Sequence, residues 1–224
     1  MDSEIEQLLL HLRISGFCIL PDVIPAVECQ AIRESVALTV QSQRENYPGA
    51  PTNVGFTPGV INHNQIFVEY LADGQLMALL GRLLGPHVRI SFTSAIVNEP
   101  GNQRGAWHAD WPFNQKNAGH IPAPYPDAVM HMTTLWMLSP FNEENGGTLV
   151  LPGSHRSPTN PTAGDGPEPM QPLPTEVNAT GSAGSVLIMD SRLWHATAPN
   201  HSAISRVTLA VRYAPWWLNL EVLR

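Results

Sequence analysis

Two histidines and one aspartate have the types and spacing of a metal site. His108 and Asp110 lie two residues apart, and His195 follows far downstream, eleven residues before Arg206. In an extended segment, side chains at positions i and i+2 point to the same face, so His108 and Asp110 can reach one ion. Two imidazoles and one carboxylate can hold Fe(II) on one face and leave the opposite face open for a cosubstrate and dioxygen. An iron-dependent oxygenase is therefore the first hypothesis.

Arg206 supplies what such a site needs next, a fixed fork of donors for a carboxylate. It precedes an apolar alternation at Val207, Leu209 and Val211, and we expect the arginine to be buried in register with these inward-facing residues. A buried arginine needs an anionic partner. That partner is either an acidic side chain, in a structural salt bridge, or the carboxylate of an oxoacid cosubstrate.

The spacing of His108 and Asp110 is not specific by itself, because the chain has nine histidines. Taken singly, His108 is as readily a structural histidine as a ligand, and His195 with its downstream arginine is what favours the metal. Two other histidines are expected to be structural. His155 follows a strand in a Pro-Gly-Ser-His turn, where it can bond backbone and fix the loop, and His131 lies within a predicted strand.

Composition limits the possible partners. The chain has 12 basic and 19 acidic residues, a net charge of −7, which argues against nucleic acid because phosphate binding requires a basic surface. Cys18 and Cys29 lack a CxxC spacing and are expected to be buried free thiols. Small molecules or a neutral partner surface remain possible. We see no apolar run of membrane-spanning length and no secretory signal, so a soluble cytoplasmic protein is expected.

The elements that must position these residues change in character along the chain. Amphipathic helices are predicted over 3–14, 26–44 and 73–84, with a short strand at 17–20. Short β-type runs then follow at 88–98, 129–138, 147–151, 185–189, 193–195 and 206–213. Two irregular stretches, 112–127 and 158–180, have the length of lids or mobile segments. This order predicts a mainly β sandwich or barrel with flanking N-terminal helices.

Four segments together resemble the phytanoyl-CoA dioxygenase family of Fe(II)- and 2-oxoglutarate-dependent oxygenases. They are Ser15-Gly16-Phe17-Cys18-Ile19-Leu20-Pro21-Asp22-Val23, Trp107-His108-Ala109-Asp110, the run from Asn145 to His155 with its Pro-Gly-Ser-His ending, and Trp194-His195-Ala196 through to Arg206. The resemblance implies a double-stranded β-helix, the jelly-roll or cupin-like barrel. We expect one such domain over 1–224, helical to about residue 86 and barrel from about 87.

The resemblance also implies two cofactors, Fe(II) and 2-oxoglutarate. It assigns His108, Asp110 and His195 as the iron ligands. It assigns Arg206 to the distal carboxylate of 2-oxoglutarate, and it places the hydroxyl of Thr197 near that carboxylate.

Trp136 and Thr148 are expected on strands that line the barrel, where they would border the cosubstrate, although core packing is the more common role for such a tryptophan. Several aromatic residues are candidates for a substrate box, and some of them are expected to be core: Trp107, Trp111, Phe113, Tyr125, Trp216 and Trp217.

The function that follows is hydroxylation of a C–H bond in a small metabolite or natural-product intermediate, with release of succinate and CO2. The carboxylate at Asp110 favours hydroxylation, or a related desaturation or cyclisation, over halogenation. The acyl-CoA substrate that names the family is not transferred, because members of one fold act on different molecules. Two alternatives stay open: a cupin-type metal barrel that needs no oxoacid, and a non-catalytic binding barrel. The sequence does not indicate an oligomeric state.

Overall fold

Three α-helices lie in the described N-terminal part of the protein. The computed structural model describes residues 2–110, 124, 127–164 and 166–218. The α-helices are α1 (Asp2–Ser15), α2 (Ala26–Gln43) and α3 (Gly74–Leu84), close to the predicted ranges. Four short 3-10 helices are also present: η1 (Arg44–Asn46), η2 (Val60–Asn62), η3 (Val68–Ala72) and η4 (Ser154–Arg156). No helix in these described ranges is both long and apolar enough to span a bilayer.

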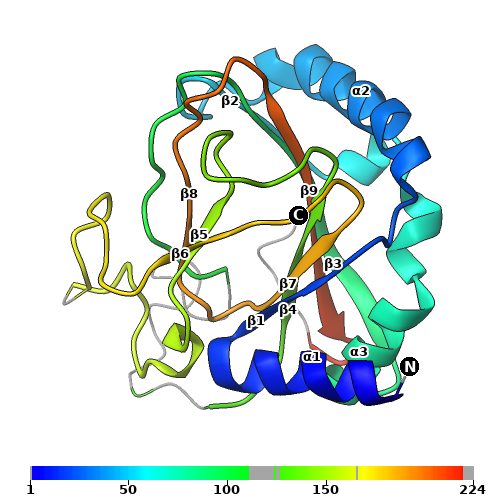
Figure 1. Ribbon diagram of the computed structural model, residues 1–224, viewed down its shortest axis with the longest axis vertical. Helices are drawn as coiled ribbons and strands as arrows, with labels where there is room; N and C mark the ends of the chain where they lie inside the picture. Colours follow the sequence, from blue (N-terminus) through cyan, green and yellow to red (C-terminus); the bar gives the residue numbers. More distant parts are fainter. Residues whose placement is uncertain (1, 111–123, 125–126, 165, 219–224) are drawn as a thin grey trace.

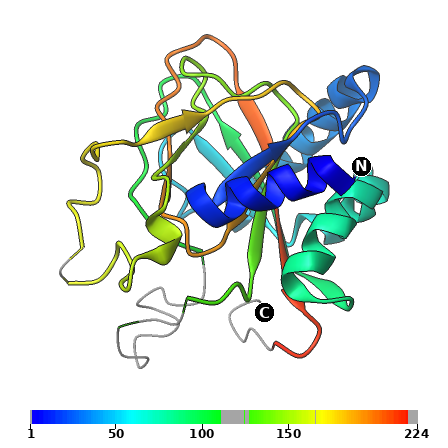
Figure 2. The ribbon, with the colours of Figure 1, turned by 60° about the horizontal axis from the view of Figure 1, so that its bottom comes forward.

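Two antiparallel sheets form the rest of the fold. The larger has the order β1-β7-β4-β9-β3-β2, from β1 (Phe17–Leu20), β2 (Val54–Pro58), β3 (Val88–Asn98), β4 (Met132–Met137), β7 (Val186–Asp190) and β9 (Arg206–Pro215). The smaller has the order β6-β5-β8, from β5 (Thr148–Val150), β6 (Val177–Ala179) and β8 (His195–Thr197). The three α-helices lie on one side of the large sheet and the small sheet on the other (Figures 1 and 2). The predicted jelly-roll with N-terminal helices is confirmed.

Side-chain alternation along the central strands separates two apolar clusters. On β4, Met132 and Trp136 belong to the cluster that packs the helices against the large sheet. Leu135 and Met137 belong to a second cluster inside the barrel, between the two sheets. Because successive side chains point to opposite faces of a strand, one residue of sequence decides whether a side chain faces the helices or the barrel interior.

The strand boundaries differ from the predicted ones in places with a physical reason. β2 was not predicted, because its five residues include Gly55 and Pro58, which are unfavourable in most strands. β6 has only three residues and lies within the stretch 158–180, predicted to be irregular. The stretch 112–127 falls almost entirely outside the described residues. β1 and β2 both join the large sheet, so the first 86 residues contribute strands as well as helices.

Gly16 connects α1 to β1 in a conformation that only glycine adopts easily, with φ at +84°. A Cβ atom at this position would lie 2.5 Å from Nδ1 of His155 and 2.7 Å from Cδ1 of Leu193. His155 is buried in η4 and packs directly over this glycine. The prediction that His155 is structural therefore has a specific basis: it closes the segment after β5 onto the start of β1.

Replacing Gly16 with alanine is expected to lower the free energy of unfolding by about 2 kcal/mol or more, from backbone strain and overpacking together. Gly81→Ala is the matched control, because Gly81 is in α3 and a Cβ there meets nothing within 4 Å. That variant should be neutral or slightly stabilising. Urea unfolding of both variants is the measurement, and equal midpoints would contradict the packing described.

Candidate metal centre

His108, Asp110 and His195 form a cluster whose candidate ligand atoms all lie within 4.8 Å of one another. The backbone brings them together. The N–H of His108 donates to the carbonyl of His195 at 3.0 Å, and the N–H of His195 donates back at 2.9 Å. The N–H of Asp110 donates to the carbonyl of Ser191 at 2.8 Å, just before β8. The segment 108–110 therefore runs alongside β8 as an added extended segment, with His108 and Asp110 on one face.

Both imidazoles are oriented by hydrogen bonds to the backbone. Nδ1 of His108 lies 3.0 Å from the carbonyl of Ala106, and Nδ1 of His195 lies 2.9 Å from the carbonyl of Leu193. A carbonyl only accepts, so each Nδ1 donates its hydrogen to the backbone, and Nε2 is the ring nitrogen left for a metal. Bonds of this kind fix the tautomer and ring orientation of metal-binding histidines.

The two Nε2 atoms point toward the carboxylate of Asp110. Nε2 of His195 is 3.6 Å from Oδ2, and Nε2 of His108 is 4.0 Å from Oδ1. The ring centroids of the two histidines are 4.2 Å apart. This leaves space for one ion among the three side chains, and the donor set of two imidazoles and one carboxylate suits Fe(II) with open positions.

The charge state of the ligands already suits a cation. Burial raises the pKa of Asp110, but the positive charge of Arg212 and the contacts with His195 and His108 outweigh it and hold the pKa well below its usual value. Burial, followed by the neighbouring His108, lowers the pKa of His195 to about 4. At neutral pH Asp110 is therefore ionised and His195 is neutral, the forms that bind a metal.

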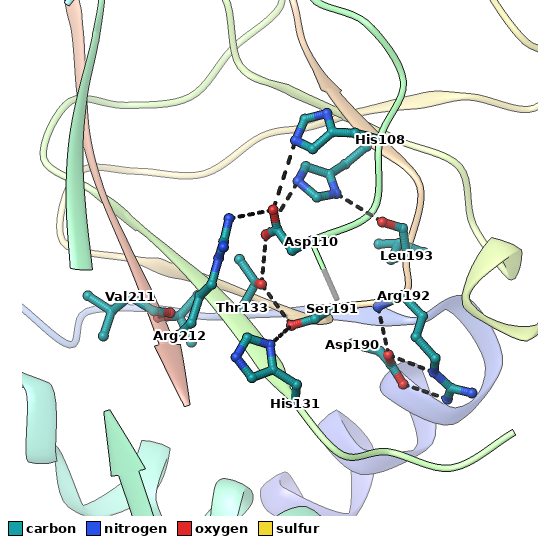
Figure 3. A network of polar contacts seen from close by, with 12 residues as sticks. His108, Asp110, His131, Thr133, Asp190, Ser191, Arg192, Leu193, Val211 and Arg212 are labelled. Atoms are coloured by element: carbon teal, nitrogen blue, oxygen red, sulfur yellow. Dashed lines mark hydrogen bonds and ion pairs between the residues drawn. The ribbon is translucent and has the colours of Figure 1, made fainter. Parts of the chain in front are cut away.

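Two residues that the sequence analysis missed hold the Asp110 carboxylate (Figure 3). Nη2 of Arg212 donates to Oδ1 at 2.5 Å, and Oγ1 of Thr133 donates to Oδ2 at 2.8 Å. Asp190 lies nearby in the same view, but Nε and Nη2 of Arg192 donate to its two oxygens at 3.0 and 2.8 Å. Asp190 is set apart from Asp110 by its position, because the carboxylate that lies within 4.8 Å of the His108 and His195 ligand atoms is that of Asp110.

Arg206 is buried, with 2% of its surface exposed, but its predicted register was wrong. Val207, Leu209 and Val211 pack with the helices on the outer face of β9. Arg206 faces the barrel interior, where its guanidinium carbon lies 4.5 Å from the ring centroid of Phe141. Adjacent residues of a strand alternate between faces, so Arg206 and Val207 cannot share one.

The surroundings of Arg206 leave polar atoms without partners. In the described part of the chain no acidic side chain forms a salt bridge with Arg206, and its buried Nε has no hydrogen-bond partner. Two further buried polar atoms lack a partner. They are Oδ1 of Asn98, the β3 residue that pairs in register with Arg206, and Oγ1 of Thr208, two residues along β9. Burial lowers the pKa of Arg206 to about 9, so the guanidinium stays charged at neutral pH. A buried charge of this kind calls for an anionic ligand.

Of the remaining predicted residues, Thr148 and Thr197 face the barrel interior, and Trp136 faces the helices. Thr148 is buried on β5 in the register position opposite Thr197 of β8. Thr148 shares its strand face with Val150 of the interior cluster, and Thr197 shares its face with His195. Trp136 is not brought to the site. It is fully buried among the helix-facing residues, where its Nε1 donates to Oγ1 of Thr134 at 2.8 Å, so it has the core role that was the alternative.

The aromatic candidates do not form one group. Trp107 is a core residue, 1% exposed, and its Nε1 donates to the carbonyl of Gln171 at 2.9 Å. Trp216 and Trp217 follow β9 and are 66% and 58% exposed. Trp111, Phe113 and Tyr125 lie outside the described residues. Both cysteines are buried and unpaired, as predicted.

Comparison with known families gives one match that spans most of the chain. The family model described as Phytanoyl-CoA dioxygenase (PhyH) matches residues 12–208. This range includes all three candidate ligands and Arg206.

Similar curated proteins are named as dioxygenases. Dioxygenase af480 of Aspergillus fumigatus is 30% identical over 133 residues, which are 59% of this chain and 39% of that protein. A probable alpha-ketoglutarate-dependent hypophosphite dioxygenase of Stutzerimonas stutzeri is 29% identical over 154 residues, 62% of this chain and 50% of that protein. The chain therefore matches half or less of the length of these two relatives.

Solved structures show the same fold at low sequence identity. HygX from Streptomyces hygroscopicus, with nickel and 2-oxoglutarate bound, has a TM-score of 0.69 at 17% identity, covering 96% of this chain and 88% of that one. The epimerase SnoN, in complex with Fe3+, alpha-ketoglutarate and nogalamycin RO, has a TM-score of 0.71 at 21% identity, covering 96% and 85%.

Proposed function

Because this chain belongs to the phytanoyl-CoA dioxygenase family, we propose that it is an Fe(II)- and 2-oxoglutarate-dependent dioxygenase that hydroxylates a small molecule. The observation that carries the proposal is the convergence of His108, Asp110 and His195 within 4.8 Å, with both imidazoles presenting Nε2. The bound iron would supply the reactivity with dioxygen and the oxidative decarboxylation of 2-oxoglutarate to succinate and CO2.

The protein residues would bind and orient the reactants. His108, Asp110 and His195 would hold the iron, with Asp110 offsetting one of its charges. Arg206 would bind the distal carboxylate of 2-oxoglutarate, and the unpartnered polar atoms of Asn98 and Thr208 on the same face support a polar ligand there. Phe141 keeps the guanidinium in place through its ring face. Thr197 and Thr148 remain proposed neighbours of the cosubstrate.

The exposure of the ligands supports access from one side. The His108 side chain is 45% exposed, whereas those of His195 and Asp110 are 9% and 6% exposed. We infer that the substrate approaches past His108. The relatives support a small-molecule substrate, since one is named for hypophosphite and SnoN was solved with nogalamycin RO. The cytoplasmic location and the single domain over 1–224 stay predictions.

The direct test is succinate formation by the purified protein in air with Fe(II), ascorbate and 2-oxoglutarate, alone and with a panel of small metabolites. Stimulation of succinate release by a substrate would support the hydroxylase. Oxidation of a substrate that does not require 2-oxoglutarate would instead indicate the oxoacid-independent barrel. Iron binding without any turnover, or no iron binding, would favour the non-catalytic barrel.

A further inference from the structure

The carboxylate of Asp110 is held at both oxygens by groups from two strands of the large sheet. Arg212 on β9 donates to Oδ1, and Thr133 on β4 donates to Oδ2. These strands are neighbours, and Thr133 and Arg212 are directly opposed in their register. The pair therefore forms one surface of the barrel interior against which the segment 108–110 is placed. Arg212 is itself supported by Phe92, whose ring centroid lies 4.9 Å from the guanidinium carbon.

A buried chain of hydrogen bonds continues behind Thr133 (Figure 3). Oγ1 of Thr133 is 2.8 Å from Oγ of Ser191, and Oγ of Ser191 is 2.8 Å from Nδ1 of His131. On the far side of the imidazole, Nε2 of His131 is 2.9 Å from Oγ of Ser91. Thr133, Ser191 and His131 are each at most 2% exposed, so water does not compete for these bonds.

The carboxylate fixes the direction of each hydrogen bond from His131 to Asp110. An ionised carboxylate only accepts, so the single hydroxyl hydrogen of Thr133 is donated to Asp110. Ser191 must then donate to Thr133. Its hydrogen is used in doing so, and Nδ1 of His131 must therefore donate to Ser191.

The state of His131 agrees with this order. Burial, followed by the charge of Arg212, lowers the pKa of His131 to about 3, so the ring is neutral and carries one N–H. With that hydrogen on Nδ1, Nε2 can only accept, and the hydroxyl of Ser91 lies between two acceptors, Nε2 at 2.9 Å and the carbonyl of Arg212 at 3.2 Å. The structure thus defines a one-way series of donors from His131 through Ser191 and Thr133 that ends at Asp110.

We propose that Thr133, supported by Ser191 and His131, and Arg212 are positioning residues that hold Asp110 in its metal-binding orientation. This inference rests on the proposed function, because it requires Asp110 to be an iron ligand. Outer partners of metal ligands orient them, and removal of one such partner typically weakens metal binding about 10–100-fold. Neither Thr133 nor Arg212 needs to touch the ion.

Thr133→Val is the sharpest test, because valine keeps the shape of threonine and removes the hydroxyl that donates to Asp110 and accepts from Ser191. We expect the dissociation constant for Fe(II), measured by anaerobic calorimetry, to rise about 10-fold or more. With Co(II) as a spectroscopic substitute, the visible absorption of the bound ion should change in position or intensity, because one ligand oxygen has lost its partner. Thr133→Ser keeps the hydroxyl and should restore both readouts.

Thr134→Val is the matched control. Thr134 is the next residue on β4, is equally buried, and its Oγ1 donates to the carbonyl of Val211 at 2.8 Å on the face away from Asp110. Each valine variant loses two hydrogen bonds, Thr133→Val those with Asp110 and Ser191 and Thr134→Val those with Val211 and Trp136, so both are expected to lose a similar amount of stability. Only Thr133→Val should alter metal binding. Arg212→Gln, which removes the charge beside Oδ1, should weaken binding as well.

The outcomes separate this inference from the proposed function. If the wild type binds no Fe(II) or Co(II), the proposed function fails and this inference fails with it. If the wild type binds the ion and Thr133→Val and Arg212→Gln bind it with the same constant and spectrum, only this inference is overturned. Equal losses of metal binding in Thr133→Val and Thr134→Val would also overturn it, because the effect would then be one of general stability.

Discussion

Replacing Asp110 with alanine is expected to abolish substrate-linked turnover of 2-oxoglutarate and to weaken Fe(II) binding by more than about 100-fold. The expected loss exceeds that for an outer partner, which is itself about 10–100-fold, because the variant removes the only negatively charged ligand of the cluster. The measurements are anaerobic calorimetry with Fe(II) and succinate formation in air.

Glu143→Ala is the control for this substitution, because Glu143 is an exposed carboxylate in the loop before β5. It should bind iron and produce succinate as the wild type does. Full activity of Asp110→Ala would remove the metal assignment. His195→Ala gives an independent check, since it should lose the same activities while leaving Asp110 in place.

Replacing Arg206 with alanine is expected to weaken 2-oxoglutarate binding while leaving Fe(II) binding unchanged. A guanidinium that makes two charge-assisted hydrogen bonds to a carboxylate contributes about 3 kcal/mol, roughly 100-fold in affinity. The KM for 2-oxoglutarate should rise accordingly, and Arg206→Lys should recover part of the loss because lysine keeps the charge without the planar fork. Arg156→Ala, at an exposed arginine, should have no effect.

A stability measurement can show whether an Arg206 variant loses 2-oxoglutarate binding because it misfolds or because it lacks the guanidinium. The described residues provide no anion for Arg206, so Arg206→Met should raise the free energy of unfolding of the ligand-free protein by about 1 kcal/mol or more. Added 2-oxoglutarate, with the metal present, should stabilise the wild type and not this variant. A wild-type affinity for 2-oxoglutarate in Arg206→Ala or in Arg206→Met would exclude the proposed clamp.

The ligand cluster could be predicted from the sequence because its signal is local. His108 and Asp110 are two residues apart in an extended segment, and the alternation of side chains places them on one face whatever the rest of the fold does. The helices and most strands were predicted for the same reason, since each follows from the periodicity of a continuous segment.

The groups around the ligands could not be predicted, because they depend on which strands are neighbours. Thr133 and Arg212 lie 23 and 102 residues from Asp110 in the sequence, and only the order β7-β4-β9 brings them together. The direction in which Arg212 faces could nevertheless have been predicted from the sequence. Arg206 and Arg212 are six residues apart on one strand, so a correct reading of the alternation would have placed both in the barrel interior, opposite Val207.

The most direct test of the central claim is an anaerobic titration of the protein with Fe(II) in the presence of 2-oxoglutarate, followed by visible absorption. Chelation of Fe(II) by a 2-oxo acid gives a charge-transfer band that neither component gives alone. We expect a band that saturates at one Fe(II) per chain in the wild type and is absent in Asp110→Ala. A wild-type protein that shows no band, or a band of equal strength in Asp110→Ala, would contradict it.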